Sequence, residues 1–243
     1  MSAMSSIIKY HAPRDFKNLS SALSYRLYGE IKSAQMRWVP LSSCQDYVIA
    51  GGYNLSNVGH KAHVWCAGYT KPYGPSKRPE KIYSVRGPLS QARAKQHMNV
   101  STPCAGDPLL LISDIHDVSD ADLRPCFFTK EDSTLFGAKQ GMHGRYITVN
   151  DSLDTILISI KNASYVLTDL LEGIVLADAF TVRSAYVCNK PPPFVVRDYL
   201  GNFTASDKDI VCPNDIEVSN ENTLRCRNIS SLKNALLTTL PNV

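Results

Sequence analysis

Apolar residues in the first half of the chain occur in short runs that are separated by polar segments and glycines. Such runs predict buried strands at residues 7–12, 46–52, 62–66 and 81–85. Leucines at helical spacing predict a helix over residues 18–29, and a second helix is expected over 88–97, where a proline suits the first turn. A further apolar run covers residues 109–112. The first half therefore alternates between strands and helices.

The same alternation returns in the second half, after residues 113–144, where the pattern fades among acidic residues and glycines. Apolar positions from Leu153 to Ile160 mark an amphipathic helix. The elements expected after it are a strand at 164–167, a helix at 170–180, a strand at 185–188 and a closing helix around residues 232–240.

Strands that alternate with helices are typical of an α/β fold with mainly parallel sheets. We therefore predict an N-terminal α/β lobe over residues 1–112 and an irregular connection over residues 113–144. A C-terminal α/β lobe is expected over residues 145–243, and the closing helix is assigned to it.

Composition and charge narrow the functional classes. The chain has 243 residues, 44% of them hydrophobic, which is enough for one large domain or two small ones to bury a core. A net charge of +4 is too small to indicate nucleic-acid binding. No apolar run approaches the ~20 residues of a membrane span, and the N-terminus has no signal-peptide pattern. We expect a cytoplasmic protein, with a virus particle as the alternative location.

The seven cysteines give no sign of a metal site, because they are spread along the chain without a Cys-x-x-Cys pair. Free thiols are expected, and a disulfide among Cys188, Cys212 and Cys226 stays open. The sequence also contains no nucleotide fingerprint, phosphate loop or serine-nucleophile elbow.

Arg86, Gly87 and Pro88 directly follow the strand predicted at 81–85 and begin the next helix. In parallel α/β sheets, ligands gather at the carboxyl ends of strands, beside the free N–H groups of helix N-termini. Glycine allows a tight turn there, and arginine offers a guanidinium fork that matches carboxylate or phosphate. This turn is a candidate anion site. The alternative is that Arg86 bonds nearby carbonyls or pairs with an acidic neighbour.

Two further segments place polar residues at turns. Asp107 stands in Gly-Asp-Pro, where it is expected to cap or fix a loop. Asp169, Glu172 and Gly173 lie at the turn into the helix expected at 170–180. Glu172 could act as a general acid or base if its pKa is raised, or it could simply complement the helix dipole from the first turn. A glutamate at this place would repel an anionic ligand.

Three segments together resemble the polysaccharide pyruvyl transferase family in order and spacing. They read Val-Arg-Gly-Pro-Leu at 85–89, Gly-Asp-Pro-Leu-Leu-Leu at 106–111 and Leu-Glu-Gly-Ile-Val-Leu-Ala-Asp-Ala at 171–179. Similar too are the glycine-ended runs at 49–52 and 64–68 and a late Phe-x-x-x-Asp-Tyr element at 194–199. The family usually has Ser-Leu-His-Gly where this chain has Glu172, and it often has Asn-x-Gly-Asp where this chain has residues 16–19.

The resemblance implies two Rossmann-like lobes of the GT-B type. It also implies transfer of enolpyruvate from phosphoenolpyruvate to a saccharide as a ketal, with no metal or organic cofactor. Arg86, with Gly87 and Asp107, would bind the donor, aided by the turn that contains Asp169 and Gly173.

The histidine that the family has is replaced, so Glu172 and His143 are the catalytic candidates. Arg145, next to His143 in a glycine-rich segment, is a substrate-binding candidate, and the alternative for His143 is an ordinary exposed loop residue. The rival function is a catalytically inactive descendant of the fold. Such a protein would serve as a binding or structural module in a larger assembly or a virus particle.

Overall fold

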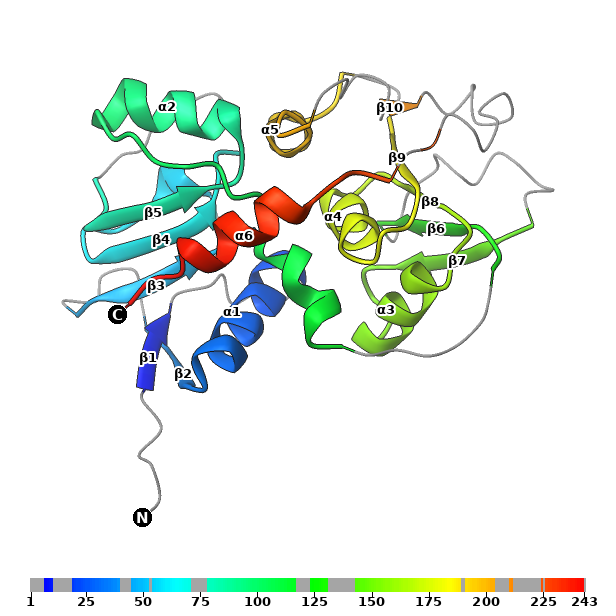
Figure 1. The fold of residues 1–243 in the computed structure, drawn as a ribbon, viewed down its shortest axis with the longest axis horizontal. Coiled ribbons are helices and arrows are strands. Elements are labelled where there is room, and N and C mark those ends of the chain that lie inside the picture. The colour runs from blue at the N-terminus through cyan, green and yellow to red at the C-terminus, as the bar shows by residue number, and fades with distance from the viewer. Residues whose placement is uncertain are drawn as a thin grey trace, which may run out of the picture. The chain divides into compact units, whose positions relative to one another are not determined.

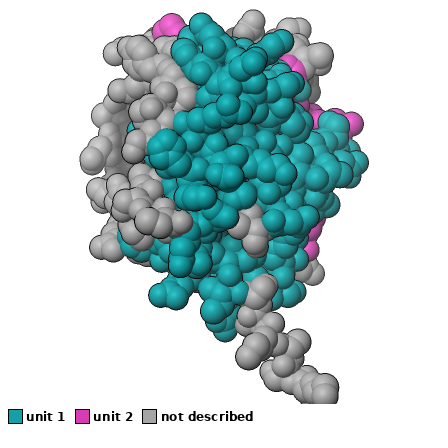
Figure 2. Space-filling view, turned by 90° about the vertical axis from the view of Figure 1, so that its left-hand side faces the viewer, with its two compact units in different colours: residues 1–109, 197–202, 230–243 teal, residues 110–196, 203–229 magenta. Residues whose placement is uncertain are grey.

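The computed structural model describes most of the chain. The described residues are 7–10, 19–39, 45–52, 54–70, 78–116, 123–130, 143–188, 191–203, 210–211, 224 and 226–242. The chain divides into two compact units: unit 1 comprises residues 1–109, 197–202 and 230–243, and unit 2 comprises residues 110–196 and 203–229. In Figure 2, the residues of unit 1, in teal, gather into one continuous surface on the face that is drawn.

Unit 1 contains a five-stranded parallel sheet (Figure 1). Its strands are β1 (Ile7–Tyr10), β2 (Gln35–Trp38), β3 (Tyr47–Ala50), β4 (Ala62–Ala67) and β5 (Lys81–Val85), in the spatial order β2-β1-β3-β4-β5. All four residues of β3 are buried, as expected for a central strand of a parallel sheet. Because the strands are parallel, the carboxyl ends of β3, β4 and β5 lie at the same edge.

Three helices pack in unit 1: α1 (Leu19–Lys32), α2 (Pro88–Met98) and α6 (Ser230–Thr238). A 3-10 turn at Leu55–Asn57 also belongs to this unit. The indole Nε1 of the buried Trp65 donates a hydrogen bond of 3.2 Å to the carbonyl of Leu236 in α6. The Tyr28 hydroxyl of α1 donates to the Pro241 carbonyl at 2.8 Å. The last segment of the chain therefore completes the core of unit 1.

Unit 2 contains a second five-stranded parallel sheet. Its strands are β6 (Cys126–Thr129), β7 (Arg145–Thr148), β8 (Val166–Thr168), β9 (Ser184–Val187) and β10 (Ile210–Val211), in the order β10-β9-β8-β6-β7. The helices α3 (Leu153–Lys161) and α4 (Leu171–Ala179) accompany it. One buried cluster in this unit joins Phe127, Leu167, Ala185, Val187 and Leu224.

The chain passes between the units at four points, and two of these points lie in helical elements. The helix α5 (Phe194–Leu200) has its last four residues in unit 1, and the 3-10 helix Pro108–Asp114 has its first two there. The apolar run at 109–112 lies within this 3-10 helix, and its leucines are buried.

The structure confirms the α/β class with parallel sheets and two Rossmann-like lobes. It places β6 inside residues 113–144, where an irregular connection was expected. All four residues of β6 are buried, and the strand pairs with β7 on one side and β8 on the other. The closing helix, α6, packs in unit 1 although it was assigned to the C-terminal lobe, because its buried residues Leu232 and Leu236 join the core that contains Trp65.

Within the described residues, no helix is long and apolar enough to cross a bilayer. Five described cysteines are free thiols, namely Cys66, Cys104, Cys126, Cys188 and Cys226. Cys212 lies outside the described residues.

Candidate functional site

Arg86 lies at the carboxyl edge of the sheet in unit 1, directly after β5, as its place in the sequence predicts. Its backbone is held on both sides. The Arg86 N–H donates to the Ala67 carbonyl at 3.3 Å, and the Arg86 carbonyl accepts from the Gly106 N–H at 3.1 Å. Cys104 pairs with Val85 in a parallel bridge, so the segment that carries Asp107 continues the sheet beyond β5. The turn and the Gly-Asp-Pro segment therefore meet.

The side chain of Arg86 is fully buried, and its nearest charge is that of Asp107. The guanidinium Nε lies 3.5 Å from Oδ2 of Asp107, as an ion pair without hydrogen-bond geometry. Neither Nε nor Nη1 of Arg86 has a hydrogen-bond acceptor within the part of the chain that is described. The other oxygen of Asp107 accepts the N–H of Leu109 at 3.1 Å, which fixes the loop as the sequence suggested. The guanidinium thus points into the protein.

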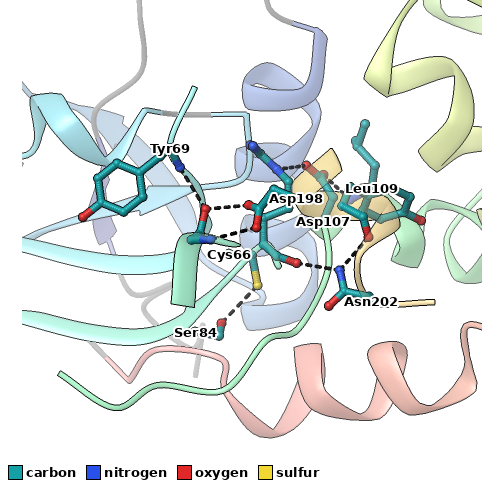
Figure 3. A network of polar contacts seen from close by, with 10 residues as sticks. Cys66, Tyr69, Ser84, Asp107, Leu109, Asp198 and Asn202 are labelled. Atoms are coloured by element: carbon teal, nitrogen blue, oxygen red, sulfur yellow. Dashed lines mark hydrogen bonds and ion pairs between the residues drawn. The ribbon is translucent and has the colours of Figure 1, made fainter. Parts of the chain in front are cut away.

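Asp198 of α5 places its carboxylate at the N-terminus of α2, in the same interior region (Figure 3). Its Oδ1 accepts the backbone N–H of Ser90 at 2.8 Å, and its Oδ2 accepts the Ser90 hydroxyl at 2.5 Å. Gly87, which precedes α2, has no side chain that could cap the helix. Asp198 therefore supplies the acceptor that a capping residue normally provides.

Two glycines allow Asp198 to approach, Gly87 chiefly beside its backbone and Gly68 beside its carboxylate. A Cβ added to Gly87 would lie 1.8 Å from the carbonyl oxygen of Asp198. A Cβ added to Gly68 would lie 3.1 Å from Oδ2 of Asp198 and 2.9 Å from Nη1 of Arg86. Gly87 has an extended backbone with φ of −158°, so the close approach of Asp198, rather than a special turn, requires glycine there.

Burial and polar contacts act on the Asp198 carboxyl in opposite directions. Burial raises the pKa of the Asp198 carboxyl, while the hydrogen bonds from Ser90, the positive charge of Arg86 and a bond from the Leu89 N–H oppose the rise. A helix N-terminus and a buried guanidinium are the elements of an anion site. At the turn where the sequence predicts an anion site, Arg86 pairs with the acidic neighbour Asp107, which is the alternative that the sequence left open, and the carboxylate of Asp198 lies at the start of α2.

Further contacts fasten the segment 197–202 around this turn. The Asn202 side-chain amide donates to the carbonyls of Arg86 at 2.9 Å and of Tyr199 at 2.8 Å. The Ser90 hydroxyl accepts the N–H of Tyr69 at 3.0 Å, which links α2 to the chain after β4. This segment is therefore an integral part of unit 1.

Cys66 lies near Arg86 and Asp107 and has the left-handed backbone conformation, with φ of 60°, at an irregularity in the pairing of β4 with β5. Its sulfur is 3.1 Å from the Ser84 hydroxyl. Burial raises the pKa of the Cys66 thiol, so the group stays protonated and is a poor nucleophile. Its contribution is to the shape of the strand end.

In unit 2, the turn from β8 into α4 holds Asp169, Glu172 and Gly173. The Thr168 hydroxyl accepts the N–H of Leu170 at 3.0 Å, and a Cβ added to Gly173 would lie 2.3 Å from that hydroxyl oxygen. Gly173 therefore allows α4 to approach the strand. Glu172, half-buried in the first turn, is placed to complement the helix dipole.

Asp169 reaches the neighbouring strand end, where Oδ1 accepts the Lys130 N–H at 3.4 Å. Burial raises the pKa of the Tyr186 hydroxyl, and the charges of Asp169, Cys188 and Glu172 raise it further. Two carboxylates, those of Asp169 and Glu172, therefore lie at this edge of the sheet.

His143 and Arg145 lie at the opposite edge of this sheet. Arg145 begins β7 and is in register with Cys126, which is in register with Val166 at the start of β8. Asp169 and Glu172 follow the end of β8. His143 is exposed and precedes β7, so the structure does not bring either residue together with Glu172.

The residues that sequence reasoning missed are Asp198 and Ser90. The late Phe-x-x-x-Asp-Tyr element was the available signal for Asp198, although nothing in it indicates that its aspartate binds the start of α2. For Ser90, a hydroxyl in the first turn of a helix was the only sign. No group of three or more His, Cys, Asp or Glu residues that could hold a metal ion occurs in the described ranges.

Comparisons with known proteins agree with the fold. No family model and no curated protein matches the chain. A solved structure of a functionally uncharacterized protein of Klebsiella pneumoniae is similar, with a TM-score of 0.54 at 11% identity, over 86% of this chain and 92% of that one. The heptosyltransferase TibC, solved with ADP-D-β-D-heptose, gives a TM-score of only 0.33 at 8% identity, over 98% of this chain and 77% of that one. The similarity to the Klebsiella protein extends to the fold alone.

Proposed function

We propose that this chain is a pyruvyl transferase-like protein that has lost ketal formation and keeps its α/β fold as a binding or structural module. The observation that carries the proposal is the Asp198 carboxylate at the start of α2, beside Arg86. In the resemblance to pyruvyl transferases, Arg86 is the group that would bind phosphoenolpyruvate.

The charges around Arg86 favour the proposal. Phosphoenolpyruvate carries a carboxylate and a phosphate, and it would meet Asp107 and Asp198, both fully buried, beside a single guanidinium. Placing a further anion in this interior is costly because buried charges need compensating partners. Arg86 is better suited to balance these two aspartates than to hold a donor molecule.

The turn in unit 2 supports the same conclusion independently. Glu172 stands where the family has histidine, and Asp169 lies three positions earlier on the same acidic edge. A carboxylate cannot bind a phosphate group as an imidazolium does. His143 and Arg145, which could have replaced the cation, lie at the other edge of that sheet.

A binding or structural role implies a protein partner, and the larger assembly that the sequence analysis considered is the context that we propose. The active alternative is transfer of enolpyruvate from phosphoenolpyruvate to a saccharide. It is the outcome that would replace the proposal.

The test is calorimetric titration of the full chain with phosphoenolpyruvate up to millimolar concentration, beside an assay of phosphate release with candidate saccharides. We expect no saturable heat and no phosphate release, which corresponds to affinity weaker than about −4 kcal/mol. Phosphate release by the wild type that depends on a saccharide would overturn the proposal.

Glu172→His tests whether the missing histidine alone, rather than the surroundings of Arg86, prevents donor binding. Glu172→Gln is its matched control. If only the imidazole were missing, Glu172→His would gain donor binding while Glu172→Gln would not. We expect both variants to stay inactive and to bind no phosphoenolpyruvate, because Arg86 is engaged in the interior. Donor binding restored by histidine alone would contradict this expectation.

A further inference from the structure

We propose that the turn at the start of α2 is a carboxylate-binding site whose resident ligand is the Asp198 side chain. A small free monocarboxylate, such as formate, can occupy this site when that side chain is removed. In the wild type, the segment 197–202 provides this ligand from within the chain. This inference concerns the site itself and does not depend on whether the protein transfers enolpyruvate.

The site has separate contacts for the two oxygens of a carboxylate. One oxygen accepts the Ser90 N–H and the other accepts the Ser90 hydroxyl, at 2.8 Å and 2.5 Å. The α2 N-terminus contributes its dipole, and the helix has no side-chain cap of its own. A bidentate cradle of this kind matches a flat anion with two oxygens.

Arg86 is the second, independent sign of an anion site. Its side chain is only 1% exposed, and Nη1 has no hydrogen-bond acceptor in the described residues. A single point near Gly68, where a Cβ would lie, is 2.9 Å from Nη1 and 3.1 Å from Oδ2 of Asp198. The guanidinium therefore faces the carboxylate across the space that the glycine leaves.

The size and charge of the site select the ligand class. Gly68 and Gly87 leave room for a carboxyl group, but a Cβ at either position would come within 3.1 Å of Asp198 atoms. Phosphate is larger and more highly charged, and Asp107, which pairs with Arg86, would repel it more strongly. We therefore expect formate to bind better than phosphate.

Removal of the Asp198 side chain leaves no buried charge without a partner, because Arg86 and Asp107 remain as an ion pair. The loss leaves the Ser90 N–H and hydroxyl without their acceptor, which is the deficit that a free carboxylate can repair.

The experiment is thermal unfolding of Asp198→Ala in sodium formate, compared with sodium chloride and sodium phosphate at equal ionic strength. We expect a saturable rise in Tm of about 2–5 °C with formate beyond the rise with chloride, by binding to the folded state. Asp198→Asn is the matched control, because its amide still occupies the site, and neither this variant nor the wild type should show the formate-specific rise.

An equal response of Asp198→Ala, Asp198→Asn and the wild type to formate would overturn the proposal. Failure of Asp198→Ala to fold even in sodium formate would overturn it too, because a free carboxylate would then be unable to replace the side chain. Saturation by phosphate at lower concentration than formate would show that the ligand class is wrong.

Discussion

Asp198 and Ser90 are 108 positions apart in the sequence and share two hydrogen bonds, one from the Ser90 backbone and one from its hydroxyl. The pair joins α5 to the N-terminus of α2. It also brings a second carboxylate near Arg86, which already faces Asp107. The stability of unit 1 should therefore depend on how these three charges are balanced.

The first prediction concerns pH. The pKa of Asp198 is raised above its ordinary value of 3.8, so the folded protein binds this proton more tightly than the unfolded chain does. Its contribution to stability is therefore fully present below pH 3.8 and is lost as the pH rises through the folded-state pKa. Urea unfolding should show the free energy of unfolding of the wild type falling relative to that of Asp198→Asn as the pH rises from about 4 to about 7. A difference that changes in the opposite direction would refute this assignment.

The second prediction concerns the buried ion pair. Arg86→Leu removes one partner and leaves Asp107 and Asp198 uncompensated, so it should lower the free energy of unfolding by about 3–5 kcal/mol. Arg86→Leu combined with Asp107→Asn should cost less than the sum of the two single changes, because the partners act as a unit. Urea denaturation of all four proteins measures the coupling.

The exposed pair of Arg26 and Glu30 provides the control for this cycle, with a separation of 2.9 Å. Arg26→Leu should cost less than about 1 kcal/mol, because solvent screens an exposed pair. Equal costs for Arg26→Leu and Arg86→Leu would show that Arg86 is not the buried cation of a coupled cluster.

Much of the fold could be predicted from local pattern. The strands β3, β4 and β5 are short, mostly apolar segments before glycines or a turn, and the expected bounds agree closely with the structure. The strand β6 was missed because only four residues, Cys126–Thr129, are buried there, between a proline and a charged stretch. The edge strand β2 was missed because Gln35 and Arg37 interrupt its apolar positions.

The candidate site was predictable only in part. The position of Arg86 after a strand follows from the sequence, because strand ends and helix starts are locally marked. The direction of its side chain does not, since it depends on Asp107 and on a carboxylate more than 100 positions away. The grouping of α6 with unit 1 is a long-range fact of the same kind, which depends on Trp65 and Leu236.

The third prediction concerns the start of α4. Gly173→Ala should destabilise the protein by about 1–3 kcal/mol, because the new methyl group would overlap the Thr168 side chain at 2.3–2.8 Å. Thr168→Ala removes two of the three crowding atoms, so the double variant should recover part of the loss. Thermal unfolding of the two single variants and the double variant measures it, and a double variant less stable than either single variant would contradict the packing argument.

The fourth prediction compares adjacent leucines in α6. Leu236 is fully buried and Leu237 is 50% exposed. Leu236→Ala should therefore lower the free energy of unfolding by about 2–5 kcal/mol, whereas Leu237→Ala should change it by less than about 1 kcal/mol. Urea unfolding followed by tryptophan fluorescence suits this comparison, because Trp65 bonds to Leu236. Similar costs at the two positions would mean that α6 does not dock as described.

The docking of α6 onto Trp65 has a consequence for synthesis on the ribosome. The five strands of unit 1 emerge first. Asp198, which binds the start of α2, is translated much later, and α6, which contacts Trp65, is the last helix to be made. Chains grow at about 5–20 residues per second, so the nascent sheet waits several seconds with its indole and its helix start unsatisfied. During this interval the surface that α6 covers in the folded unit stays exposed on the growing chain, and apolar surface exposed in this way is prone to aggregation.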